Sequence, residues 1–177
     1  MSPPARSAVF ASRPLAALAG PRDAVRQFTP NWFAAVMGTG VLALALGQWP
    51  GSAPKLALLG EWLCLANSAV FVAFCAMYAA RWLLFFDEAR RIFGHATMSM
   101  FLGTLPMALA TLINGLLRFG LPRWGAAAVL PLAEALWWLD VAMALACGVA
   151  IPWLMFTRQR HRLEQMTAVW LLPIVAA

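Results

Sequence analysis

The sequence predicts an all-α integral membrane protein with about five membrane-spanning helices. Hydrophobic residues fill 63% of its 177 positions and charged residues only 11%, whereas charged residues make up about a quarter of an ordinary soluble domain. Long apolar runs alternate with short segments that carry arginine, as spans alternate with loops in membrane proteins. We expect the spans at residues 29–48, 56–86, 96–117, 124–156 and 166–177.

The first expected span begins at Thr29-Pro30-Asn31, where proline suits the first turn of a helix. Trp32 and Phe33 follow as an interfacial aromatic anchor. The uncharged stretch from there to Gln48 is roughly 27 Å long as a helix, close to the thickness of a bilayer core. Gly38-Thr39-Gly40 in its middle brings the backbone close to a neighbour, which is either another helix or a solute.

The other segments differ in character. Residues 1–27 are rich in proline, alanine and arginine and are expected to form a disordered, basic cytoplasmic leader. The third span is expected to end at Gly120-Leu121-Pro122, and Pro131 to separate an interfacial turn from the fourth span. The final 12 residues are too short to cross a bilayer, so we expect them to be the start of a truncated fifth span.

The positive charges predict the orientation. The formal net charge of +6 is explained by loop arginines rather than by nucleic-acid binding. Three cations fall on one side, Lys55, Arg118 and Arg123, and ten on the other, Arg6, Arg13, Arg22, Arg26, Arg81, Arg90, Arg91, Arg158, Arg160 and Arg162. The side with ten is expected to be cytoplasmic, together with the N-terminus, in a bacterial inner (plasma) membrane.

The third expected span is the most polar. Thr104 and Thr111 are seven residues apart and share a face, and Asn114 lies one turn further on. Pro106 frees a backbone carbonyl nearby. These residues, with Gly103, either line a pore and hydrate a passing solute or allow close helix packing. The two interpretations carry equal weight.

A weak internal repeat links the odd-numbered spans. Met37-Gly38-Thr39 resembles Leu102-Gly103-Thr104, and Pro106 corresponds to Pro173 in the fifth span. The repeating unit would be a helical hairpin, and broken helices in such repeats commonly lie beside a transport path.

Few other side chains point to chemistry. Among the carboxylates of the spans, Asp140 is the deepest; a structural pairing is favoured over a proton relay. His95, Met98 and Met100 form a spacing that could bind copper, which is a minor alternative because no second histidine lies in a span. No hydrolase, metalloprotease or nucleotide-binding motif occurs. We therefore expect no enzyme, cofactor or metal.

Four phrases taken in order, FTPNWFAAVMGTGVLALAL, HATMSMFLGTLPMALATLINGL, LWWLDVAMAL and TAVWLLPIVAA, resemble the tellurite-resistance/dicarboxylate transporter (TDT) family. That family includes malic acid transporters, sulfite efflux pumps and slow anion channels. The resemblance implies ten helices as five hairpins in a quasi-fivefold ring, often assembled as trimers, of which this chain would be the N-terminal half. It also implies that odd-numbered helices are inside, so that Gly38, Thr39, Gly40, Gly103, Thr104, Pro106 and Pro173 line an anion path.

The sequence therefore predicts a transporter or channel for small anions. The expected substrates are either C4-dicarboxylates such as malate, or sulfite. The candidate path residues are those implied by the resemblance together with Thr111 and Asn114. The alternative is a non-transporting assembly factor whose small residues only pack helices. Membrane lipid and an anionic solute are the expected partners, and no nucleic acid.

Overall fold

The computed structural model describes residues 20–50, 54–95 and 97–157, and these residues are all-helical, with no strand. The elements in chain order are α1 (Pro21–Arg26), η1 (Pro30–Trp32), α2 (Phe33–Gly47), α3 (Pro54–Leu84), α4 (Phe86–Ala89), η2 (Arg90–Gly94), η3 (Met100–Gly103), α5 (Thr104–Gly115), the π-helical turn η4 (Leu116–Gly120), α6 (Leu121–Trp124) and α7 (Ala126–Thr157).

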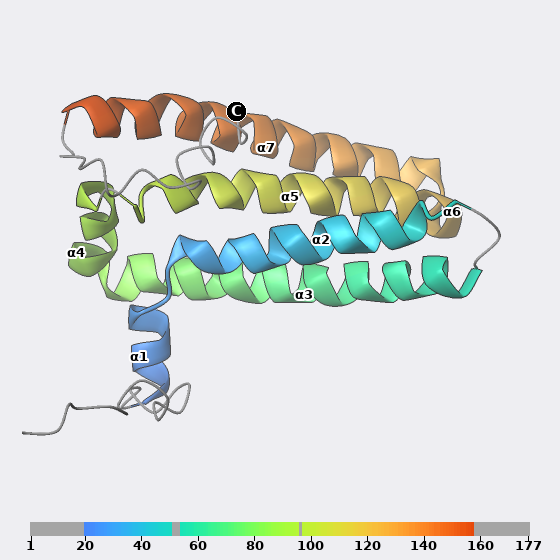
Figure 1. Cartoon of the computed structure of the whole chain (residues 1–177), viewed down its shortest axis with the longest axis horizontal. Helices are drawn as coiled ribbons and strands as arrows, with labels where there is room; N and C mark the ends of the chain where they lie inside the picture. Colours follow the sequence, from blue (N-terminus) through green and yellow to red (C-terminus); the bar gives the residue numbers. More distant parts are fainter. Residues whose placement is uncertain (1–19, 51–53, 96, 158–177) are drawn as a thin grey trace, which may run out of the picture.

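Four stretches among the described residues are long and apolar enough to cross a membrane: Pro30–Gly47, Pro54–Leu84, Met100–Trp124 and Ala126–Thr157. They lie side by side in the order α3, α2, α5, α7, with α2 packed between α3 and α5, and α5 packed between α2 and α7 (Figure 1). The prediction of an all-α membrane protein is confirmed. The fifth expected span, with Pro173, lies outside the described residues.

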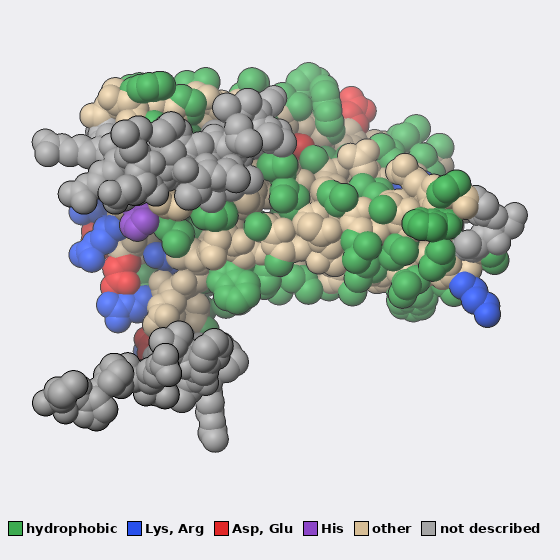
Figure 2. Space-filling model, in the orientation of Figure 1, with side chains coloured by type: hydrophobic (Ala, Val, Ile, Leu, Met, Phe, Trp, Pro, Cys, Tyr) green, Lys and Arg blue, Asp and Glu red, His purple; other side chains and the backbone are tan. Residues whose placement is uncertain are grey.

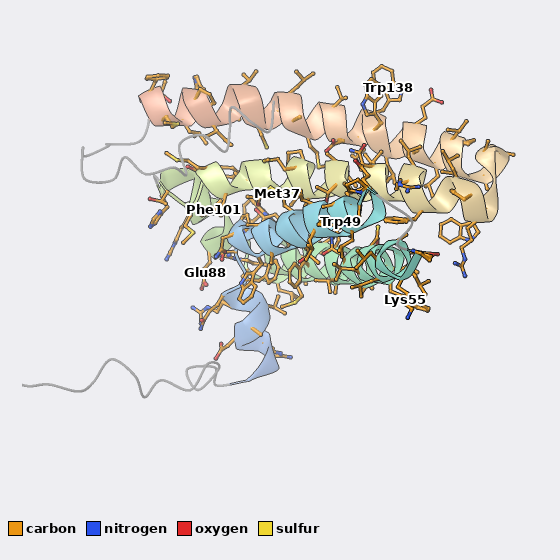
Figure 3. All side chains as sticks on the ribbon, turned by 45° about the vertical axis from the view of Figure 1, so that its right-hand side comes forward. Met37, Trp49, Lys55, Glu88, Phe101 and Trp138 are labelled. Carbon is orange, nitrogen blue, oxygen red and sulfur yellow. The ribbon has the colours of Figure 1, made fainter. Side chains whose placement is uncertain are left out.

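The first and third spans are the inner ones. In the most apolar window of each span, 33% and 50% of their residues are buried, against 11% for the spans of α3 and α7. Side chains of the outer helices project away from the bundle, as Trp138 does in Figure 3. The predicted difference between odd-numbered and even-numbered spans is therefore present in the four described spans.

Aromatic packing and two polar bonds fix the start of α2 against α3. The Phe33 ring is fully buried and meets Phe71 and Phe74 edge-on. Asn67 donates a hydrogen bond of 2.9 Å to the Val36 carbonyl, and the buried Arg81 donates to the carbonyl of Phe28. These two α3 side chains would be costly at membrane depth without such acceptors.

The structure differs from three expectations, two of them about helix breaks at proline and one about the leader. The third span does not end at Gly120-Leu121-Pro122 but continues through η4 and α6 to Trp124, and the chain turns at Gly125, whose φ is +78°. Pro122 lacks an N–H and crowds the carbonyl four residues before it, and a wide π turn accommodates this without breaking the helix. Pro131 lies inside an uninterrupted α7, since spans tolerate the loss of one backbone bond.

The third difference concerns the expected leader, where residues 21–26 form the short helix α1 rather than a disordered segment. Pro21 occupies its first turn, Asp23 lies near the positive N-terminal end and Arg26 near the negative C-terminal end. Each placement favours a helix. The rest of the predicted leader lies outside the described residues.

Candidate anion pathway

One face of the third span is committed to packing against α2. Thr104, Thr111 and Arg118 are spaced by seven residues, and each meets α2 or the turn before it. The fully buried Thr104 hydroxyl lies 3.0 Å from the Pro30 carbonyl and 2.7 Å from the Phe101 carbonyl. Thr111 bonds to the Ala108 carbonyl at 2.7 Å, within its own helix.

The two candidate glycines of α2 have different surroundings. A methyl group added to Gly40 would collide with the Thr111 side chain and lie 3.3 Å from the Asn67 amide. Gly38 is exposed, and an added methyl would meet nothing within 4 Å. Gly40 thus permits close approach of α5, whereas Gly38 opens space beside α2. Thr39, between them, is half-buried.

Gly103 and Pro106 lie on a buried part of the third span. Pro106 lines an apolar cavity of about 310 Å³ between α3, α5 and α7, together with Tyr78 and Cys147. Neither residue is on the exposed side of α5. The apolar lining of this cavity suits a hydrocarbon neighbour better than an anion.

The exposed residues of the two inner helices form what we term the open face: Ala35, Gly38, Val41, Leu42 and Ala45 on α2, and Asn114 on α5. Figure 2 shows backbone and other uncharged atoms in tan along the middle of the molecule, over α2 and α5, with hydrophobic side chains among them and along the lower side. Asn114 bonds to the Ala110 carbonyl at 2.8 Å through one amide hydrogen and carries a second. The helical segments α2 and α5–η4 contain no carboxylate.

The family model described as SLAC1, voltage-dependent anion channel, matches residues 27–177. The chain belongs to the SLAC1 family. The suspected relationship to this group of transporters and channels is thereby confirmed, because the matched residues include all four described spans and both inner helices.

Relatives within the SLAC1 family carry two kinds of names. The chain is 38% identical over 153 residues to the sulfite efflux pump SSU1 of Trichophyton rubrum, covering 86% of this chain and 40% of that protein. It is 23% identical over 150 residues to the malic acid transport protein of Schizosaccharomyces pombe, covering 85% of this chain and 34% of that protein. The chain thus spans about 40% or less of the length of these relatives. No solved structure matches it.

Two charged residues within the spans each have a buried side-chain atom without a hydrogen-bond partner. One carboxylate oxygen of Asp140 on α7 is buried with no hydrogen-bond partner, so the favoured structural pairing is not present at that atom. The buried Arg81 bonds to Phe28 but leaves its Nε without a partner.

The three residues whose spacing could bind copper, His95, Met98 and Met100, are not brought together into one site. Met100 is buried in the core, while His95 is exposed and its Nδ1 accepts the Met98 backbone N–H at 3.3 Å. Among the described residues, no three histidine, cysteine or acidic side chains converge as metal ligands.

From the sequence, Arg118 is expected only as a loop charge at the end of the third span. In the structure its Nη2 donates a hydrogen bond of 2.5 Å to the Gly47 carbonyl, at the end of α2. The seven-residue spacing from Thr104 and Thr111 was the available signal, since helical positions seven apart share a face. The expected break at Pro122 had placed Arg118 outside the span.

Proposed function

We propose that the intact protein carries small oxyanions across the membrane along the open face of α2 and α5, with sulfite as the best-supported substrate. This proposal rests mainly on one observation: the exposed residues of the two inner helices include no carboxylate and include the Asn114 amide. The other exposed residues of this face are glycine, alanine, valine and leucine, so it offers an anion the Asn114 amide dipole and no repelling charge. Membership of the SLAC1 family supports transport rather than catalysis.

The choice of sulfite rests on similarity. The relatives that share 37–38% identity are named sulfite efflux pumps, whereas those named for malic acid share 23–24%. Malate is therefore the second substrate to test. A homotrimer in the plasma membrane, with the arginine-rich end in the cytoplasm, completes the proposal. The relatives named sulfite efflux pumps include those of Trichophyton rubrum and Arthroderma otae, and the bacterial inner membrane expected from the sequence stays a prediction.

The proposed lining differs from the set derived from sequence. Gly38, Thr39 and Asn114 remain candidates for the path. The contacts of Gly40, Thr104 and Thr111 support helix packing, as the second of the two original interpretations held. The buried positions of Gly103 and Pro106 support the same role.

The test is sulfite flux in proteoliposomes that contain the intact protein. Asn114→Leu removes the amide and should lower flux by roughly tenfold, equivalent to ~1.4 kcal/mol in a barrier. Gly38→Leu should also lower flux by obstructing the path. Val72→Leu, an exposed position on the outer helix α3, is the control and should leave flux unchanged.

Normal flux in a correctly folded Asn114→Leu protein would remove α5 from the path. Flux of malate but not of sulfite would show that malate, rather than sulfite, is the substrate. If the unsubstituted protein moved neither anion, the non-transporting assembly factor would become the better explanation.

A further inference from the structure

Arg118 differs from Arg123, the other arginine near its end of the bundle, in lacking an acidic partner. Arg123, five residues later, forms an ion pair with Glu61 of α3. Among the described residues, no carboxylate lies within ion-pair distance of Arg118, including Glu134 of α7. One guanidinium hydrogen is used by the Gly47 carbonyl, and an arginine has five N–H donors in all.

The local helix geometry explains why Arg118 lies beside the end of α2. Pro122 cannot donate to the carbonyl of Arg118, four residues earlier, and the chain adopts the π turn η4 at Leu116–Gly120. Such turns within a helix are frequent at functional sites. The Phe119 ring packs over Gly47, where an added methyl would lie 2.5 Å from the ring. These contacts hold the turn against the end of α2.

The position of Arg118 relative to the open face follows from the helix. It lies four residues, or about one turn, beyond Asn114. Both side chains are exposed. The hydrogen bond to Gly47 extends the Arg118 guanidinium from the third span to α2, so that it bridges the two inner helices where the open face ends.

We propose that Arg118 is the residue that captures and selects the anion at the Gly47 end of the pathway, with a small oxyanion such as sulfite as its ligand. This rests on the proposed function. The free N–H groups of a guanidinium match the oxygens of an oxyanion. An unneutralised cation at a mouth also raises the local anion concentration, and salt screens that effect.

The experiment compares Arg118→Gln, Arg118→Lys and the control Arg123→Gln in the intact protein. Sulfite flux and the anion-to-cation permeability ratio are measured from low to ~1 M ionic strength. Arg118→Gln should lower flux about fivefold at low salt, a factor expected for one unit charge near an exposed anion. The deficit should vanish near 1 M, where the screening length is ~3 Å.

Arg118→Lys keeps the charge, and should retain the permeability ratio and most of the flux. It also keeps the proposal testable if Arg118→Gln fails to fold. A purely structural role would give a salt-independent loss in both Arg118 variants. That result, or an equal loss in Arg123→Gln, would overturn the proposal. Absence of anion flux in the unsubstituted protein would instead contradict the proposed function itself.

Discussion

At the scale of single residues, the same residue type has opposite roles two positions apart. Gly38 and Gly40 are separated by about 200° around the helix axis. Gly40 therefore faces Thr111 and Asn67, while Gly38 faces open space. Within the Gly-Thr-Gly segment, Gly40 is therefore a packing site and Gly38 is a candidate lining residue of the anion path.

Matched alanine substitutions test this division. Gly40→Ala should destabilise the protein by about 1–3 kcal/mol, because the new methyl overlaps the Thr111 side chain. Gly38→Ala should be neutral or stabilising by up to ~1 kcal/mol, since it adds helix propensity in free space. Thermal unfolding in detergent measures both, and equal Tm values for the two variants would show that α5 does not approach Gly40 this closely.

At the scale of elements, polar side-chain bonds fix the positions of short segments outside the apolar spans. The helix α1 leaves the bundle near the start of α2 (Figure 1) and is tied to α4 by Arg26 and Glu88. The guanidinium meets the carboxylate at 2.6, 2.8 and 3.0 Å. This bond to Arg26 holds the pKa of Glu88 below its ordinary value.

The tether should therefore depend on pH in a defined direction. A carboxyl group whose pKa is lowered by folding contributes stability above its ordinary range and loses it as the pH falls through the lowered value. The protection of the α1 amides, measured as their hydrogen-exchange rate relative to an unstructured peptide at the same pH, should fall below about pH 4.5, the ordinary value of the group. In Glu88→Gln, this protection should be low and independent of that titration.

Asp87→Asn is the control for that measurement, because the ion-pair partner of Asp87 is Arg90, three residues away, and not Arg26 of α1. Its exchange profile should match that of the unsubstituted protein. Persistent protection of α1 in Glu88→Gln would show that packing alone holds the helix.

At the scale of the whole molecule, the charges separate to the two ends of the bundle. Glu88 and Lys55 mark opposite ends in Figure 3. Arg26, Arg90 and Arg91 belong to segments at the Glu88 end, beyond the spans. Because short basic segments remain in the cytoplasm, the Glu88 end is expected to be cytoplasmic.

Cysteine labelling in intact cells tests this orientation. An impermeant thiol reagent should modify K55C from outside but R91C only after the membrane is opened. The unsubstituted protein is the control, since Cys64, Cys75 and Cys147 lie within the spans. Labelling of R91C from outside would reverse the topology and place Arg118 at the cytoplasmic mouth.

Much of the fold could be predicted from the sequence, but less of the site. Four of the five expected spans correspond to long apolar helices among the described residues, because crossing a bilayer requires long uncharged helices. The boundaries at Pro122 and Pro131 were not, because proline breaks a helix only where its lost bond is left unsatisfied. Thr104 and Thr111 were recognised as one face, but their packing role required the position of α2.

The sequence alone determined that this chain is a set of apolar helices whose first and third members carry the small and polar residues, since hydrophobicity and residue size are local properties. Tertiary structure decided which side of each helix faces a neighbour. The helices α2, α3 and α7 are apolar on all sides, so no amphipathic pattern indicates their contact faces. Only packing of α5 on α2 separated Gly40 from Gly38 and brought Arg118 to the end of α2.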